Sequence, residues 1–152
     1  MRRTILKLAG IAAVAAVLGG CAASGAKYQE MASSMPGLKA GQGRIYFLRS
    51  SSMFGAAVQP EIRLNGQVVG QSKPGGFFYV DRAAGTYSAT TATETENSAS
   101  FKLDPGETKY LRTSPSMGLL AGRIVVQLES AEKAKAELPS LSYTGGEKVS
   151  AK

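Results

Sequence analysis

The sequence predicts an all-β fold, an antiparallel β-sandwich or small barrel of about eight strands with a short helix near the C-terminus. Short runs that alternate apolar and polar side chains recur between turn signals, as expected for half-buried strands. Asn65-Gly66 between two such runs is a strong hairpin signal, because both residues accept the positive φ of a type I′ turn. No helical segment separates the strands, which argues against a parallel sheet.

The N-terminus has the features of a bacterial targeting signal. Eleven residues without a polar side chain, 8–18, follow the basic residues Arg2, Arg3 and Lys7. As a helix they would span about 16 Å, roughly half of a bilayer core, which is too short for a membrane span. Residues 1–20 are therefore predicted to be a signal peptide.

The signal ends in Leu-Gly-Gly-Cys at 18–21, which resembles a bacterial lipobox. The resemblance implies a lipoprotein, with a palmitate-containing lipid attached to Cys21 and cleavage in front of it. Because Ala22 rather than Asp follows the cysteine, the resemblance also implies the periplasmic face of the outer membrane. The alternative is an ordinary secretory signal with an incidental cysteine.

The remaining elements follow in order along the chain. Residues 21–42, rich in Ala, Ser and Gly, are expected to form a flexible tether for a domain at 43–144. The first strand is apolar on both faces and therefore central, and Pro60 weakens the start of the second. Ser130 caps a short helix, and the tail at 145–152 is expected to be disordered. The predicted strands are 43–49, 58–64, 67–71, 77–81, 86–93, 98–103, 107–113 and 122–129.

Two resemblances support the predicted fold. Residues 61–70 with 84–87 are similar to the hairpin-and-turn pattern of PEGA-type and prealbumin-like β-sandwich modules. The segments 43–49, 65–70, 76–81 and 106–112 together resemble an uncharacterised family of bacterial lipoprotein domains, over residues 43–144. The second resemblance implies a domain of unknown function and supplies no catalytic residues.

The composition excludes several kinds of chemistry. The chain has no histidine, which excludes Ser–His–Asp catalysis, and one cysteine, which excludes an internal disulfide. The net charge of +7 includes three basic residues of the signal peptide, and the other basic residues are scattered, so nucleic-acid binding is not expected. Glu94 and Glu96, the closest acidic pair, lack the spacing of a calcium loop. The sequence predicts no enzyme, no cofactor and no metal site.

One repeated pattern suggests a binding region. Strands one and seven both end in aromatic-Leu-Arg, followed by hydroxyl residues, a methionine and a nearby glycine. If the strands alternate up and down, both loops lie at one end of the domain with 72–76 and 94–97, and the tight turns lie at the other. The candidate binding residues are Arg49, Ser51, Met53, Phe54, Arg112, Ser114 and Met117.

Two interpretations of these loops stay open. Met53, Phe54, Met117 and Leu119 either plug the end of the sandwich or form a recognition face. In the second case the arginines that precede the loops would bind a carboxylate or phosphate.

We therefore expect a non-enzymatic interaction or accessory module, anchored to the membrane by a lipid on Cys21, with a protein or envelope partner. The alternative is a binding protein for a small envelope ligand, a glycan or peptide fragment. Because the chain enters the first strand from the tight-turn end, the anchor is expected beneath that end, and the methionine loops are expected to face away from the membrane.

Overall fold

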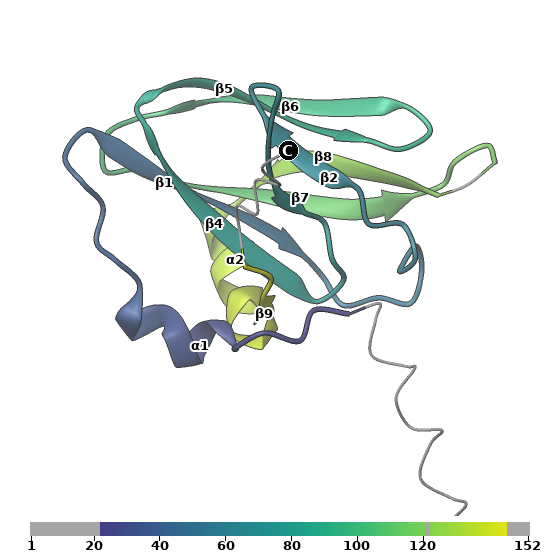
Figure 1. The fold of residues 1–152 in the computed structure, drawn as a ribbon, viewed down its shortest axis with the longest axis horizontal. Coiled ribbons are helices and arrows are strands. Elements are labelled where there is room, and N and C mark those ends of the chain that lie inside the picture. Colours follow the sequence, from purple (N-terminus) through teal and green to yellow (C-terminus); the bar gives the residue numbers. More distant parts are fainter. Residues whose placement is uncertain (1–21, 121, 146–152) are drawn as a thin grey trace, which may run out of the picture.

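The computed structural model describes residues 22–120 and 122–145. Signal peptide, Cys21 and most of the predicted tail lie outside this part of the chain. The described chain forms two sheets that pack into an open sandwich (Figure 1). The five-stranded sheet has the order β8 (Arg123–Glu129), β7 (Thr108–Ser116), β1 (Gln42–Arg49), β4 (Gly76–Ala83) and β9 (Ser142–Tyr143). The four-stranded sheet has the order β3 (Gln67–Gln71), β2 (Glu61–Leu64), β5 (Gly85–Ala92) and β6 (Glu96–Leu103).

Local sequence patterns predicted most strands correctly. β1 is the central strand of its sheet and is buried on both faces, as its apolar run indicated. Asn65 and Gly66 have φ of 47° and 83°, which confirms the hairpin. β2 is shorter than predicted and begins directly after Pro60, which has no amide hydrogen to donate to a ladder.

The antiparallel prediction is wrong for two strand pairs. β1 pairs in parallel with β7, and β4 in parallel with β9. The tight turn predicted at 82–85 is also replaced, because β4 continues to Ala83 and the chain crosses at Ala84 into the other sheet. There it forms β5 and β6 before it returns as β7 beside β1. Strands of the opposite sheet thus supply the crossover connection that parallel strands need.

The sandwich is open rather than closed into a barrel. Near β8, polar side chains bridge the two sheets: Asn97 Oδ1 accepts from the amide of Val126 at 2.7 Å, and Thr91 Oγ1 donates to the carbonyl of Ile124 at 2.7 Å. The apolar core between the sheets includes Phe101, which belongs to the alternating strand that the sequence predicted. Its buried members are Ile45, Phe47, Ile62, Leu64, Val69, Phe78, Val80, Ala89, Phe101, Leu103, Leu111 and Val126.

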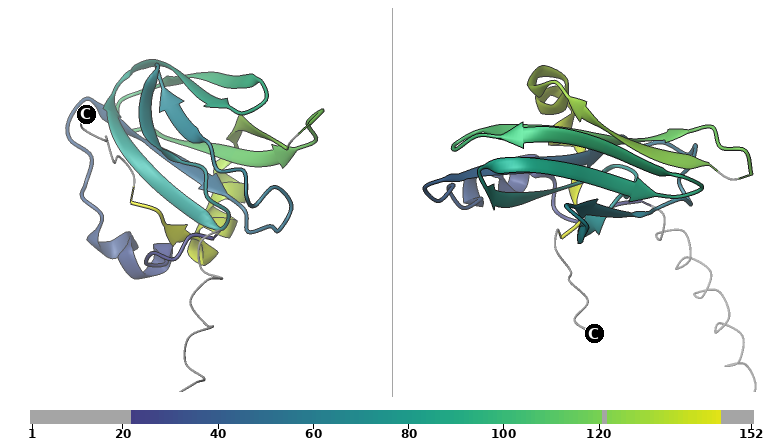
Figure 2. Two further views of the ribbon diagram at one scale, coloured as in Figure 1. Left: turned by 45° about the vertical axis from the view of Figure 1, so that its right-hand side comes forward. Right: turned by 90° about the horizontal axis from the view of Figure 1, so that it is seen from above.

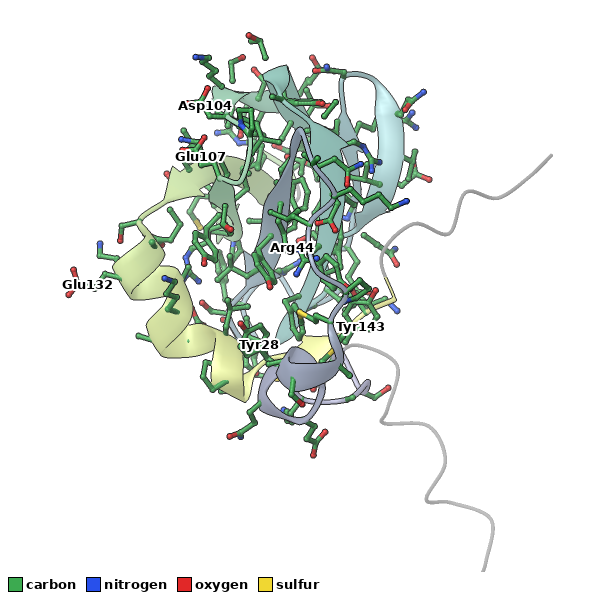
Figure 3. All side chains as sticks on the ribbon, turned by 90° about the vertical axis from the view of Figure 1, so that its left-hand side faces the viewer. Tyr28, Arg44, Asp104, Glu107, Glu132 and Tyr143 are labelled. Atoms are coloured by element: carbon green, nitrogen blue, oxygen red, sulfur yellow. The ribbon has the colours of Figure 1, made fainter. Side chains whose placement is uncertain are left out.

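A second apolar cluster lies on the outer face of the five-stranded sheet. It is covered by α1 (Tyr28–Met31) with the 3₁₀ turn η1 (Ala32–Ser34), and by α2 (Ala131–Glu137) with η2 (Leu138–Ser140). Ser130 Oγ accepts from the amide of Lys133 at 3.3 Å, so the predicted cap is confirmed. Figure 3 shows Glu132 on the solvent side of α2 and Tyr28 on the side of α1 toward the sheet.

The segment predicted as a flexible tether is folded where the structure describes it. The amide of Tyr28 donates to the carbonyl of Leu141 at 3.1 Å, and the Tyr28 ring packs edge-on against Phe77 with centroids 5.5 Å apart. Composition suggested flexibility, but Tyr28, Met31 and Met35 are spaced to cover an apolar surface and all pack on the outer cluster. The aromatic face of the sheet needs this cover, because it would otherwise be exposed to water.

Candidate functional site

The irregular loops lie together at one end of the sandwich, as predicted. We call this the loop end, formed by residues 50–60, 72–75, 93–95 and 117–120. The amide of Ser72 donates to the carbonyl of Pro60 at 2.9 Å, and the amide of Leu119 donates to Glu94 at 2.8 Å. The β5–β6 and β7–β8 connections project to the same end (Figure 2). The parallel pairing of β1 with β7 makes both strands exit here.

Five large apolar side chains of the loop end are exposed, and we call them the apolar rim. Their exposed fractions are 92% for Met53, 53% for Phe54, 74% for Met117, 95% for Leu119 and 98% for Leu120. The interpretation that these loops plug the sandwich is therefore wrong, since side chains that fill a core are buried. Leu120 was not among the predicted site residues and belongs to the same surface.

Arg49 closes this end of the core and holds the 50–60 loop. Only 2% of it is exposed. Its guanidinium donates to the carbonyl oxygens of Gly55 at 2.7 Å and Val58 at 2.8 Å, and to both oxygens of Ser72. Ser72 Oγ in turn lies 2.8 Å from the hydroxyl of Thr113. Burial lowers the pKa of the Arg49 guanidinium below its ordinary value. Arg49 therefore fixes the loop that presents Met53 and Phe54, and it does not face a ligand.

Arg112 also has internal partners. Its Nε lies 2.7 Å from Glu129, and its Nη1 lies 2.7 Å from Glu137 of α2 and donates to Ser50 Oγ at 2.6 Å. The hydrogen bond from Arg112 holds the pKa of the Glu129 carboxyl below its ordinary range. The arrangement ties the start of the 50–60 loop to β8 and α2.

The two arginines lie on opposite faces of the sheet. The sequence pattern aligned Arg49 with Arg112, but the register of the parallel pair sets Leu48 opposite Arg112. Alternation along the strands then turns Arg49 toward the four-stranded sheet and Arg112 toward α2. The internal contacts of the two arginines do not support the prediction that they bind a carboxylate or phosphate ligand.

Glu94 positions the second loop of the rim. Its carboxylate oxygens accept from the amides of Leu119 at 2.8 Å and Leu120 at 2.5 Å, and Arg123 Nη2 donates to the carbonyl of Met117 at 3.1 Å. These bonds fix the backbone and leave the apolar side chains in solvent. Sequence reasoning missed this role, because Glu94 and its partners are 25 and 26 residues apart.

The two predicted serines have different surroundings. Ser51 is exposed in the 50–60 loop, and a Cβ added at Gly75 would lie 3.5 Å from its Cβ. Ser114 is half-buried in β7 opposite Val125. Among the described residues, no group of three or more His, Cys, Asp or Glu side chains is arranged to hold a metal ion. In the same part of the chain, no helix has the length and apolar character that a membrane span requires.

The described chain begins at the loop end and not at the tight-turn end. The amide of Ala23 donates to the carbonyl of Pro74 at 3.0 Å, and a Cβ added at Gly76 would lie 3.0 Å from Ala23 Cβ. From there the segment runs back beneath the sheet to enter β1 from the tight-turn end (Figure 1). The expectation that the N-terminal side lies beneath the tight-turn end assumed a tether without contacts, and is wrong for this reason.

Comparison with known proteins places the chain in a family. A family model described as "Protein of unknown function (DUF2846)" matches residues 39–126, more than half of the sequence. The chain belongs to this family. A curated relative, an uncharacterized protein of Haemophilus influenzae, is 25% identical over 138 residues, which cover 88% of this chain and 82% of the relative. No solved structure matches the chain significantly.

The DUF2846 match fits the predicted resemblance to an uncharacterised domain family. It begins just before β1 and ends within β8, so it includes every residue of the apolar rim. Cys21, α1 and α2 lie outside the matched residues.

Proposed function

We propose that this DUF2846 protein is a lipid-anchored protein of the bacterial cell envelope, held through Cys21 at the periplasmic face of the outer membrane. Its β-sandwich acts as a non-enzymatic interaction module. The observation that carries the proposal is the apolar rim, which presents large side chains to solvent from two loops at one end of the fold. The lipobox-like sequence at 18–21 supports the anchor.

Exposed apolar side chains that gather on neighbouring loops mark interaction surfaces, whereas single ones are ordinary. The rim is also preorganised. Arg49 holds one loop from within the core, and Glu94 and Arg123 hold the other through its backbone. A surface whose loops are already ordered loses less conformational entropy on binding than a flexible one.

A non-enzymatic role is supported by the charged groups of the loop end. Arg49 and Arg112 donate to internal oxygen atoms, and Glu94 accepts from two backbone amides. These groups stabilise the loops rather than face a shared space where a substrate would react. The alternative is a binding protein for a small envelope ligand, a glycan or peptide fragment. No specific observation favours it, because the arginines offered as ligand contacts have internal partners.

Site-specific photocrosslinking in cells tests the proposed interaction surface. A photoreactive amino acid at Phe54 should crosslink to a partner, lipid or protein, while the same group at Leu128 should not. Leu128 is a matched control, because its side chain is apolar and 48% exposed but lies on β8 away from the rim. Equal crosslinking from both positions would contradict the proposal.

Metabolic labelling with palmitate tests the anchor separately. Wild-type protein should carry the label and Cys21→Ala should not, because the thiol is the acceptor of the lipid. An unlabelled wild type would show that Cys21 is not lipidated.

A further inference from the structure

The N-terminal boundary of the described chain constrains where an anchor at Cys21 must lie. Ala23 is hydrogen-bonded to Pro74 of the loop end at 3.0 Å. Consecutive Cα atoms are about 3.8 Å apart, so two further residues extend the chain by at most about 8 Å from Ala23. Two residues cannot reach the opposite end of the sandwich, because the eight residues of β1 alone span roughly 26 Å. Whatever holds Cys21 is therefore close to the loop end.

The surface is continuous from this point to the apolar rim. Pro74 precedes Gly75, where an added Cβ would lie 3.5 Å from Ser51 Cβ. Ser51 is two residues before Met53 in the same exposed loop. The first loop of the rim lies against the end of β7, the strand that leads into the second loop, because an added Cβ at Gly55 would lie 2.7 Å from Pro115 Cβ.

We infer that the apolar rim docks on the lipid bilayer that holds Cys21, with its methionine, phenylalanine and leucine side chains inserted into the membrane interface. The inference rests on the proposed lipidation and names the partner of the proposed interaction surface. A bilayer that holds the lipid of Cys21 lies against the end of the molecule where these side chains are exposed. The rim can therefore insert into it without rotation of the domain. This orientation is the reverse of the one predicted from the sequence.

The chemistry of the loop end suits an interfacial position. The amides of Leu119 and Leu120 donate to Glu94, and the carbonyl of Met117 accepts from Arg123. Shallow insertion therefore does not strip these backbone groups of partners, which would otherwise oppose it. Lys73 and Arg123 place two positive charges at the same end, against the one negative charge of Glu94, and a positive balance suits anionic lipid headgroups. Apolar side chains beside basic ones are typical of surfaces that lie in the membrane interface.

Fluorescence depth measurements on the full lipoprotein, purified and reconstituted in vesicles of phosphatidylethanolamine and phosphatidylglycerol, test this orientation. Single cysteines replace Leu119, Met53 or, as a control at the tight-turn end, Gln67, and each is labelled with an NBD dye. Because the sequence has one cysteine and the lipid occupies it, each variant offers one free thiol. Probes at Leu119→Cys and Met53→Cys should shift to the blue and be quenched by phospholipids with a spin label on the acyl chain. The probe at Gln67→Cys should do neither.

The outcomes separate this inference from the proposed function. If wild-type protein takes up the thiol dye, Cys21 is free and the proposed anchor fails. If the anchor is intact but Leu119→Cys behaves as Gln67→Cys does, the bilayer does not cover the rim and the inference is wrong. A blue shift without quenching by spin-labelled lipid would also overturn it, because a protein or a second copy of the chain would then cover the rim.

Discussion

Arg49→Met should release the 50–60 loop and destabilise the fold. The substitution keeps an apolar stem in the core and removes the guanidinium that donates to Gly55, Val58 and Ser72. The bonds to Ser72 are buried, and an unsatisfied buried acceptor costs about 1–3 kcal/mol. The carbonyl oxygens of Gly55 and Val58 are only partly buried, so water replaces the lost donor there.

An opposing effect reduces the loss. The hydrogen bonds of Arg49 go to carbonyl and hydroxyl oxygens rather than to a carboxylate, so its removal also relieves the cost of burying a cation. The net decrease in the free energy of unfolding should be about 1–2 kcal/mol. For a chain of this size it corresponds to a fall in melting temperature of about 2–8 °C.

Thermal and urea denaturation measure this effect, with Arg63→Met as the matched control. The Arg63 side chain is 47% exposed and pairs with Glu61 at the surface, so its loss should change stability by less than about 0.5 kcal/mol. Hydrogen exchange should also accelerate at the amide of Val58, which donates to Gly55 within the released loop. If Arg49→Met matches Arg63→Met in stability and leaves exchange at Val58 unchanged, Arg49 does not hold this loop.

Three further predictions concern the fold. Phe101→Ala removes a buried ring from the core between the sheets and should lower the free energy of unfolding by roughly 3–5 kcal/mol, measured by urea denaturation. A loss below about 1 kcal/mol would contradict the core position of Phe101. Replacing Asn65-Gly66 by Val-Val should lower the melting temperature, because both positions have positive φ, which strains a β-branched residue. An unchanged melting temperature would show that the turn does not require positive φ at these positions. The Glu129 carboxyl, whose pKa Arg112 holds below 4.5, stabilises the fold above pH 4.5 and loses this contribution as the pH falls through its folded pKa. The destabilisation by Arg112→Met should therefore be full at pH 7 and shrink toward pH 3, and a constant difference would contradict the ion pair.

Local patterns predicted the strands and turns because their causes are local. Alternation in β6 places Phe101 and Leu103 in the core, and the Asn65-Gly66 pair accepts the positive φ of its turn. The grouping of the loops at one end was also predictable. It required only that β1 and β7 have the same direction, which holds whether or not they are neighbours.

The site could not be predicted to the same extent, because its determinants are contacts between distant segments. The repeated aromatic-Leu-Arg pattern suggested that Arg49 and Arg112 are equivalent, but a register offset of one residue puts them on opposite faces. The position of the N-terminal segment depends on how Tyr28 packs on Phe77 and on the bond from Ala23 to Pro74. Composition carries no information on either contact.

Equilibrium unfolding of a triple variant, Met53→Ser with Phe54→Ser and Met117→Ser, tests whether the apolar rim is exposed in solution, as an interaction surface requires. Because these side chains are largely exposed, the free energy of unfolding should stay within about 1 kcal/mol of the wild-type value. A loss of about 3 kcal/mol or more, as large-to-small substitutions in a core produce, would show that these side chains are buried in solution and that the rim is not a surface for any partner.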